Sequence, residues 1–272
     1  IDLDSTTKLY PPSDEQIKIL ESLGKGNSVI VDAVAGSGKT TTNLWIAKTF
    51  KTNKILLLTY NSRLRLETRE KTQKLGIDNL EVHTYHSFVW NYFTSNLDTK
   101  CKNDTIMRKM LDKGYELLKD IDFNIIIIDE AQDMTPLYCE LLKNILKSSK
   151  VIPDKLCFLG DCMQSIYNFK DADSRFLSCA DKIFNQYNNW TKLKLSESFR
   201  ISADMALFIN KIVLREDRIK SSKPLTKKPE YYICDVFDDS LNSPIFQKVE
   251  DLLKISILNI NVSMLKVISI FN

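Results

Sequence analysis

The fold of this chain is decided by the stretch Ala33-Val34-Ala35-Gly36-Ser37-Gly38-Lys39-Thr40. An apolar run, residues 28–31, comes just before it, and a helix-like segment begins near Thr41. Two glycines in the stretch allow the backbone to turn its amide groups inward, where they can contact phosphate oxygens. With its Gly-Lys-Thr ending and its place between a strand and a helix, the stretch matches a Walker A motif, whose strict form has Gly where this chain has Ala33.

The motif predicts a site for ATP and Mg²⁺. Lys39 is expected to reach the β- and γ-phosphates, and the Thr40 hydroxyl is expected to ligate Mg²⁺. The residues expected to contact the nucleotide here are Ala35, Gly36, Ser37, Gly38, Lys39, Thr40 and Thr41. The alternative interpretation is a glycine-rich turn that binds nothing.

An acidic element argues against that alternative. The run Ile125–Ile128 predicts a buried strand, and Asp129-Glu130-Ala131-Gln132 follows it directly. A carboxylate at the carboxyl end of a strand lies beside the glycine loop in a parallel sheet. We therefore expect Asp129 to hold the metal ion and Glu130 to orient and deprotonate the attacking water.

Short apolar runs recur along the chain, at residues 28–31, 55–58, 125–128 and 156–159, with helix-like segments between them. Such runs are typical of strands buried on both faces of a parallel sheet. They predict an α/β fold, a RecA-like P-loop NTPase domain over residues 1–192, with a small helical insertion at 90–122. Residues 193–272 are expected to form the incomplete beginning of a second RecA-like domain.

The composition indicates a globular protein. Hydrophobic residues make up 43% of the 272 and charged residues 27%, and the net charge of +3 neither requires nor excludes a nucleic-acid partner. Six scattered cysteines favour free thiols in a reducing compartment. With no signal peptide and no apolar stretch near the roughly 18 residues of a membrane span, we expect an intracellular, soluble protein without a membrane partner. Nucleus and cytoplasm are not distinguished.

The acidic element and its flanking motifs resemble superfamily 1 DNA helicases of the UvrD/Rep type. The match begins at residues 10–16, which resemble the Q motif and imply that Gln16 reads the adenine edge. Residues 195–200 resemble motif IV, which implies that Phe199 stacks on adenine and that Arg200 reaches the γ-phosphate. The form of these motifs is similar to the F-box DNA helicase branch.

Three further motifs imply contacts to a DNA strand and to the γ-phosphate. Residues 58–61 resemble motif Ia, and residues 83–88 resemble the threonine-x-histidine-serine-phenylalanine element. Residues 159–169 resemble motif III, in which Gln164 senses the γ-phosphate and aromatic side chains stack on bases. The residues that these motifs imply for DNA binding are Thr59, Tyr60, Asn61, Thr84, His86, Tyr167 and Phe169.

The resemblance ends near Arg200, because motifs V and VI of the family are not found after it. Position 1 is Ile rather than Met, so we expect the chain to be part of a longer protein. The basic stretch 215–228 is interpreted as a solvated surface loop.

The resemblance implies an ATP-dependent DNA helicase or translocase that moves 3′ to 5′ on single-stranded DNA or on DNA with single-stranded tails. The alternative is a nucleotide-switched DNA-binding or assembly module that cannot unwind alone, because its second motor domain is incomplete. A P-loop kinase for a small substrate leaves the flanking motifs unexplained.

Overall fold

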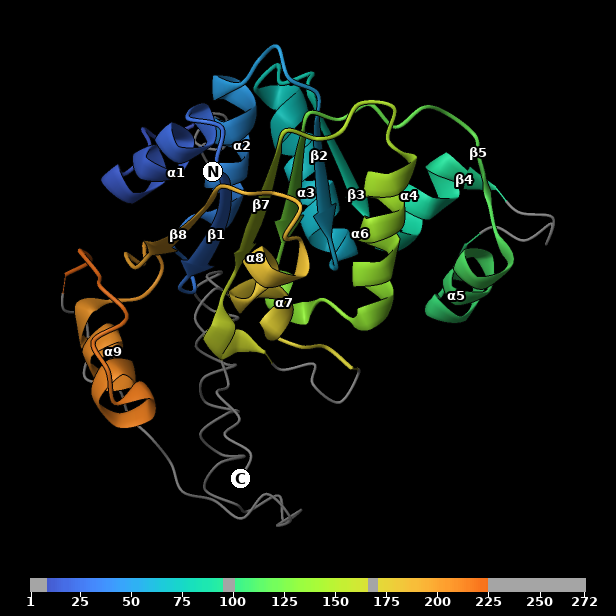
Figure 1. Ribbon diagram of the computed structural model, residues 1–272. Helices are drawn as coiled ribbons and strands as arrows, with labels where there is room; N and C mark the ends of the chain where they lie inside the picture. The colour runs from blue at the N-terminus through green and yellow to red at the C-terminus, as the bar shows by residue number, and fades with distance from the viewer. Residues whose placement is uncertain (1–8, 95–100, 166–170, 225–272) are drawn as a thin grey trace, which may run out of the picture. The chain divides into compact units, whose positions relative to one another are not determined.

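The computed structural model describes residues 9–94, 101–165 and 171–224 (Figure 1). The predicted stacking residues Tyr167 and Phe169 lie outside these ranges, as does most of the expected second domain, 225–272.

A six-stranded parallel sheet is the centre of the domain. Its strands are β1 (Ser28–Ala33), β2 (Ile55–Thr59), β3 (Leu80–Thr84), β6 (Ile125–Asp129), β7 (Lys155–Gly160) and β8 (Trp190–Leu195). They lie in the order β3-β2-β6-β7-β1-β8, and every neighbouring pair is parallel. The predicted α/β class with a parallel sheet is confirmed, and each of the four apolar runs forms a strand of this sheet.

Two hydrophobic clusters fill the space on the two faces of the sheet. Along β6, Ile126 and Ile128 belong to one cluster, whereas Ile125 and Ile127 belong to the other. All four side chains are fully buried. Because successive side chains of a strand point to opposite faces, a strand covered on both sides has to be apolar at every position.

Helices cover both faces of the sheet (Figure 1). They are α1 (Asp14–Gly24), α2 (Lys39–Thr49), α3 (Ser62–Lys74), α4 (Tyr85–Tyr92), α5 (Asp104–Lys113), α6 (Pro136–Ser148), α7 (Arg175–Ser178), α8 (Ala180–Ile183) and α9 (Ala203–Phe208). Short 3₁₀ turns at Ala131–Asp133 and Cys162–Gln164 follow β6 and β7, and a π-helical turn, Ile209–Leu214, continues α9.

The predicted insertion, residues 90–122, contains the end of α4, helix α5 and a small antiparallel pair, β4 (Phe93–Thr94) with β5 (Glu116–Leu117). Its apolar side chains Met107 and Met110 join the cluster on one face of the sheet. The predicted domain boundary after residue 192 falls inside β8, which pairs with β1 along its whole length. Within the described residues, no helix combines the length and the apolar character that a membrane span needs.

Candidate nucleotide site and a pocket between α3 and α4

The glycine loop connects β1 to α2 by a tight turn. Gly36 and Gly38 have φ angles of 77° and 89°, a left-handed conformation that disfavours residues with a Cβ. Helix α2 begins at Lys39, two residues before the predicted start at Thr41. Its N-cap is Gly38, which offers no side chain to the first amide groups of the helix. Those amides remain available to an anion, and the helix dipole favours negative charge there.

The predicted nucleotide residues lie along this turn. Ala35, Gly36 and Ser37 form the turn itself, and the partly buried Thr40 and Thr41 follow Lys39 in the first turn of α2. The Ser37 hydroxyl is buried without a hydrogen-bond partner among the described residues. A buried polar group without a partner is unfavourable, so the loop fits a phosphate that would supply one.

Gln16 is held within the protein rather than presented to a base. Its amide oxygen accepts from the Ser13 amide at 2.9 Å, which completes a capping box at the start of α1. Its amide nitrogen donates to Thr42 Oγ1 at 2.9 Å and to the Gly38 carbonyl at 3.3 Å. The side chain is 3% exposed, so reading adenine would require it to exchange these bonds.

The acidic element lies opposite the loop. Lys39 Nζ is 3.4 Å from Glu130 Oε2, and both side chains are largely buried. Asp129 is 2% exposed, and its two carboxylate oxygens accept from Asn43 Nδ2 at 3.1 Å and from the Glu130 amide at 3.0 Å. The structure therefore brings Lys39, Asp129 and Glu130 together, as the two motifs predict.

The electrostatics of these carboxylates are unusual. Burial and the neighbouring charge of Glu130 raise the pKa of Asp129 well above its ordinary value, an effect that Lys39 and Asn43 partly offset. Glu130 has a φ of 53°, a left-handed conformation that costs free energy in a residue with a side chain. Raised carboxylate pKa values and backbone strain in one place are typical of functional sites.

A divalent cation fits the nucleotide corner, the part of the site that is formed by Lys39, Asp129 and Glu130. Asp129 offers a buried carboxylate whose orientation is fixed by Asn43, and carboxylate and hydroxyl oxygens are the ligands that Mg²⁺ prefers. A cation here would also stabilise the ionised form of a carboxyl group that burial alone disfavours. Among the predicted metal ligands, Thr40 stands next to Lys39 at the start of α2.

Gln132 joins this corner to the end of β7. Its amide nitrogen donates to Glu130 Oε2 at 3.0 Å, and its amide oxygen accepts from the Asp161 amide at 3.0 Å. A Cβ on Gly160 would lie 2.3 Å from that amide oxygen, so a side chain at this position would displace the Gln132 amide. The predicted phosphate sensor, Gln164, is exposed and donates to Asp161 Oδ2 at 2.7 Å.

The residues predicted from motif IV lie against the glycine loop. The Phe199 amide donates to the Gly36 carbonyl at 2.9 Å, and the buried Ser198 hydroxyl donates to the Ala35 carbonyl at 2.7 Å. Phe199 is 47% exposed, and the Arg200 side chain is also exposed. Both side chains are thus beside the loop and open to solvent, where a nucleotide can reach them.

Gly36→Ala should destabilise the protein by about 1–3 kcal/mol. A Cβ there would lie 2.5 Å from Arg200 Cβ and 2.9 Å from Ser198 Oγ, at a φ of 77°. The added methyl group therefore has to displace the segment that carries Phe199 and Arg200. Urea unfolding measures the change, with Gly24→Ala as the control, since nothing lies within 4 Å of a Cβ at Gly24. Equal losses in the two variants would contradict the close approach.

Among the described residues, those that the resemblance implies for DNA binding lie at or just after the carboxyl ends of β2 and β3. Thr59 is paired in register with Thr84 on one side and with Asp129 on the other. Asn61 caps α3 by accepting from the Arg63 amide at 2.8 Å, and Thr84 caps α4 in a capping box with Ser87. The nucleotide corner and these residues therefore share one edge of the sheet.

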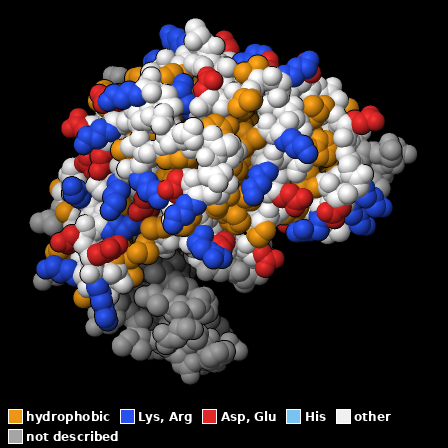
Figure 2. All heavy atoms as spheres, in the orientation of Figure 1, with side chains coloured by type: hydrophobic (Ala, Val, Ile, Leu, Met, Phe, Trp, Pro, Cys, Tyr) orange, Lys and Arg blue, Asp and Glu red, His pale blue; other side chains and the backbone are white. Residues whose placement is uncertain are grey.

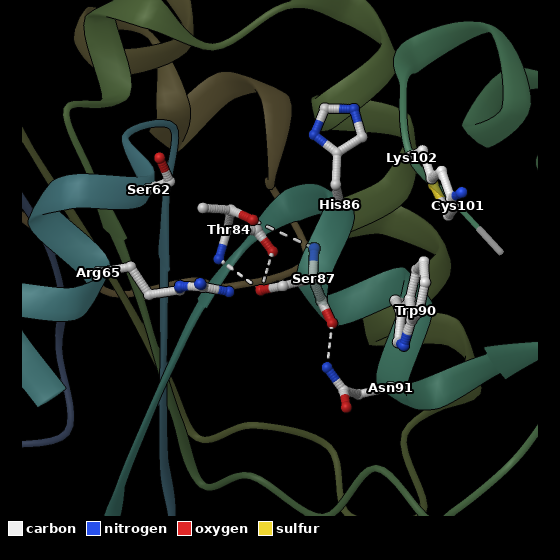
Figure 3. Close-up of a pocket in the computed structure, with 9 residues that line it drawn as sticks. All are labelled: Ser62, Arg65, Thr84, His86, Ser87, Trp90, Asn91, Cys101 and Lys102. Atoms are coloured by element: carbon white, nitrogen blue, oxygen red, sulfur yellow. Dashed lines mark hydrogen bonds between the residues drawn. The ribbon is translucent and has the colours of Figure 1, made fainter.

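A pocket of about 450 Å³ opens between α3 and α4 (Figure 3). It contains two of the predicted strand-binding residues, Thr84 and His86, but not Thr59, Tyr60 or Asn61. The other residues that line it are Ser62, Arg65, Ser87, Trp90, Asn91, Cys101 and Lys102.

Arg65 is a positively charged pocket residue that the motifs did not identify. Figure 3 shows its side chain extending from α3 toward Ser87. Its Nε is buried and has no hydrogen-bond partner within the described residues. The signal in the sequence is its position on α3, one turn after the Asn61 cap, on the side that faces α4.

His86 is partly exposed in the pocket, and its Nε2 lies 2.9 Å from Asp104 Oδ1 of α5, an ion pair only when the ring is protonated. Figure 2 shows lysine and arginine side chains scattered among acidic and apolar ones over the face in view. On that face, a polyanion would have to be recognised by local groups rather than by a broad basic surface.

A parallel sheet, a glycine loop leading into a helix, and a carboxylate pair facing the loop lysine define a P-loop nucleotide-binding domain of the RecA type. Residues 16–170 match the family described as AAA domain, and the chain belongs to this family.

The curated relatives include a RecBCD enzyme subunit and two proteins described as DNA helicases. RecBCD enzyme subunit RecB of Borreliella burgdorferi is 34% identical over 122 residues, which are 45% of this chain and 9% of that protein. The mitochondrial ATP-dependent DNA helicase HMI1 of Saccharomyces cerevisiae is 28% identical over 122 residues, 45% of this chain and 14% of that protein. A probable DNA helicase II homolog of Mycoplasma genitalium is 26% identical over 141 residues, 48% of this chain and 19% of that protein.

These relatives confirm the resemblance to superfamily 1 DNA helicases. The matched segment spans less than a fifth of the length of each. Among solved structures, unliganded Pif1 from Bacteroides sp. is similar with a TM-score of 0.44 and 18% identity, over 74% of this chain and 45% of that one.

Proposed function

We propose that this chain carries the motor domain of an ATP-dependent DNA helicase or translocase of the UvrD type, which moves 3′ to 5′ on single-stranded DNA. The observation that carries the proposal is the register at the sheet edge, where Thr59 lies between Thr84 of the pocket and Asp129 of the nucleotide site. The likeness to DNA helicases supports the choice of polymer.

Binding of ATP rests on the glycine loop. The amide groups at the start of α2 have no side-chain cap and can bind an anion, and the side chain of Lys39, which is 12% exposed, brings a positive charge. Phe199, beside Gly36, would stack on the base, and Arg200 would approach the γ-phosphate. Gln16 would act by holding Gly38 and Thr42, or would read adenine after releasing them.

Hydrolysis rests on Glu130. Its carboxylate is held by Lys39 and by the amide of Gln132, which fixes it to orient a water and to accept its proton. Asp129 and Thr40 would hold Mg²⁺, which supplies positive charge to the phosphate oxygens when it is bound. Gln164 would sense the γ-phosphate from the end of β7.

The DNA strand would occupy the pocket and its rim. Thr84, His86 and Arg65 offer hydrogen-bond donors to a phosphate, and Trp90 offers a partly exposed ring to a base. Thr59, Tyr60 and Asn61 would contact the strand from the end of β2, and Tyr167 and Phe169 would stack on its bases.

Coupling between the two sites would run through the sheet. Thr59 is fully buried and hydrogen-bonded in the sheet to the strands that end in Thr84 and Asp129. A change in side-chain geometry at the nucleotide corner would therefore be transmitted to the pocket through the adjoining ends of three β-strands rather than through a flexible loop.

ATP hydrolysis by the full-length protein tests the proposal. Single-stranded DNA should raise kcat by about 10-fold or more, because the proposed DNA-binding residues lie at the same edge of the sheet as Glu130. Intact ATP binding without stimulation would contradict the helicase proposal. Duplexes with a 3′ tail should be unwound and those with a 5′ tail should not, whereas ATP and DNA binding without turnover would favour a nucleotide-switched module.

Arg65→Ala should weaken single-stranded DNA binding by about 5- to 10-fold and lower the salt dependence of log Kd by about 0.7, the loss of one phosphate contact. ATP affinity should not change, because Arg65 lies in the pocket and not at the glycine loop. The matched control is Arg63→Ala on the same helix, whose exposed side chain pairs with Glu67. Fluorescence titration measures both variants, and equal losses would mean that only net charge matters.

A further inference from the structure

Arg218 departs from the expected surface loop. Its side chain is 9% exposed, although it lies in the basic stretch that the sequence predicts to be solvated. Its Nη2 lies 2.7 Å from Asp32 Oδ1 and 2.7 Å from Asp161 Oδ1. A residue distant in sequence from both thus delivers a positive charge to the carboxyl ends of β1 and β7.

The backbone that directly follows Arg218 is held by hydrogen bonds. The side chain of the buried Asn210 donates to the Ile219 carbonyl at 2.8 Å and accepts from the Ile219 amide at 3.0 Å. The Lys220 amide donates to the Ser196 carbonyl at 2.8 Å, and the Ser198 amide donates to the Lys220 carbonyl at 2.8 Å. Hydrogen bonds therefore tie the backbone beside Arg218 to Ser196 and Ser198, which directly precede Phe199 and Arg200 at the glycine loop.

Asp161 connects Arg218 to the nucleotide corner through hydrogen bonds. Its Oδ2 accepts from Gln164 at 2.7 Å, so Arg218 and Gln164 bind opposite oxygens of one carboxylate. Its amide donates to Gln132, which in turn donates to Glu130. The chain of contacts runs from Arg218 through Asp161 to the expected phosphate sensor and to the expected general base.

Arg218 supplies the counter-charge for two neighbouring carboxylates, Asp32 and Asp161. Oxygens of Asp32 and Asp161 and the sulfur of Cys162 lie within 4.8 Å of one another, and Arg218 is placed between the two carboxylates. Burial alone would raise the pKa of Asp32, but hydrogen bonds from Arg218 and Cys162 bring it below its ordinary value. Removing the guanidinium would leave two close carboxylates without their counter-charge.

We propose that Arg218 is a positioning residue for the γ-phosphate end of the nucleotide site. By binding Asp161, it fixes Gln164 and the link from Gln132 to Glu130, and it ties their geometry to the segment that bears Phe199 and Arg200. It touches no substrate itself. This role rests on the proposed ATP hydrolysis at Glu130.

Arg218→Met in the full-length protein should lower kcat for ATP hydrolysis by about 10- to 100-fold, the range seen when a supporting partner behind a contacting residue is removed. KM for ATP should change by less than about threefold, because Lys39 and the loop amides still bind the phosphates. Methylguanidinium at millimolar concentration should restore part of kcat, which a merely structural loss would not allow. Arg215→Met, an exposed arginine of the same loop, is the control and should retain full activity.

A double substitution tests whether Arg218 acts through Asp161. If it does, Arg218→Met combined with Asp161→Asn should lose little more than the larger single loss, because residues of one network are not additive. Additive losses, or a kcat of Arg218→Met equal to that of Arg215→Met, would overturn the positioning role while leaving wild-type turnover, and with it the proposed function, intact.

A second readout does not depend on turnover. The ratio of affinities for a non-hydrolysable ATP analogue and for ADP reports contact with the γ-phosphate, and Arg218→Met should lower it by about two- to threefold, in line with the small change expected in KM for ATP. An unchanged ratio would overturn the role even if the wild-type protein proved unable to hydrolyse ATP, which is the failure of the proposed function itself. Thermal unfolding confirms that each variant is folded.

Discussion

Glu130→Gln is expected to lower ATP hydrolysis by about 10²- to 10⁴-fold, the contribution of a general base, and to leave ATP binding intact. Glutamine has the same shape and can still accept the hydrogen bond from Gln132, so the backbone strain and the loop remain in place. It cannot accept a proton from water. Because one negative charge is removed beside Lys39, ATP affinity should be equal or higher. Steady-state hydrolysis and a fluorescent-nucleotide titration measure the two effects.

The matched control is Glu140→Gln, an exposed acid on α6, which should leave both quantities unchanged. Turnover that survives in Glu130→Gln would move the base to Asp133. This residue is 9% exposed, and burial and the charge of Glu130 raise its pKa to about 6, partly offset by Lys39. Asp133→Asn would then abolish the remaining activity.

The sequence predicts the four inner strands of the sheet but not the two at its edges. β6 is apolar at every position because both of its faces are covered. β3 includes the polar residues Glu81 and His83, and β8 includes Lys192 and Lys194. These are the edge strands, whose partly exposed residues need not be apolar, so a search for continuous apolar runs misses them.

The site divides in the same way between local and long-range features. Lys39, Asp129 and Glu130 are predictable, because the end of a strand and the start of a helix fix their positions. The anchoring of Gln16 is also visible in Ser13-Asp14-Glu15-Gln16, a capping-box pattern. Arg218 is not predictable, because its two carboxylate partners are 186 and 57 residues away and only the folded chain brings them together.

Lys39→Ala is expected to weaken ATP binding by about 10- to 100-fold, the loss of one or two charge-assisted hydrogen bonds to phosphate. Lys39 Nζ also lies 3.4 Å from the Glu130 carboxylate, and its charge partly offsets the rise in the pKa of the buried Asp129. Without it, the triphosphate would enter beside two carboxylates with no counter-charge, so affinity for ATP should fall more than affinity for ADP.

Lys48→Ala, an exposed lysine in the last turn of the same helix, is the control and should bind ATP normally. Equilibrium titration with ATP and ADP measures both variants, and urea unfolding checks that α2 still packs. The comparison with Glu130→Gln is the decisive one, because binding and hydrolysis have been assigned to different side chains of one ion pair. If both substitutions reduced ATP affinity equally, the ion pair would act as a unit and the assignment would be wrong.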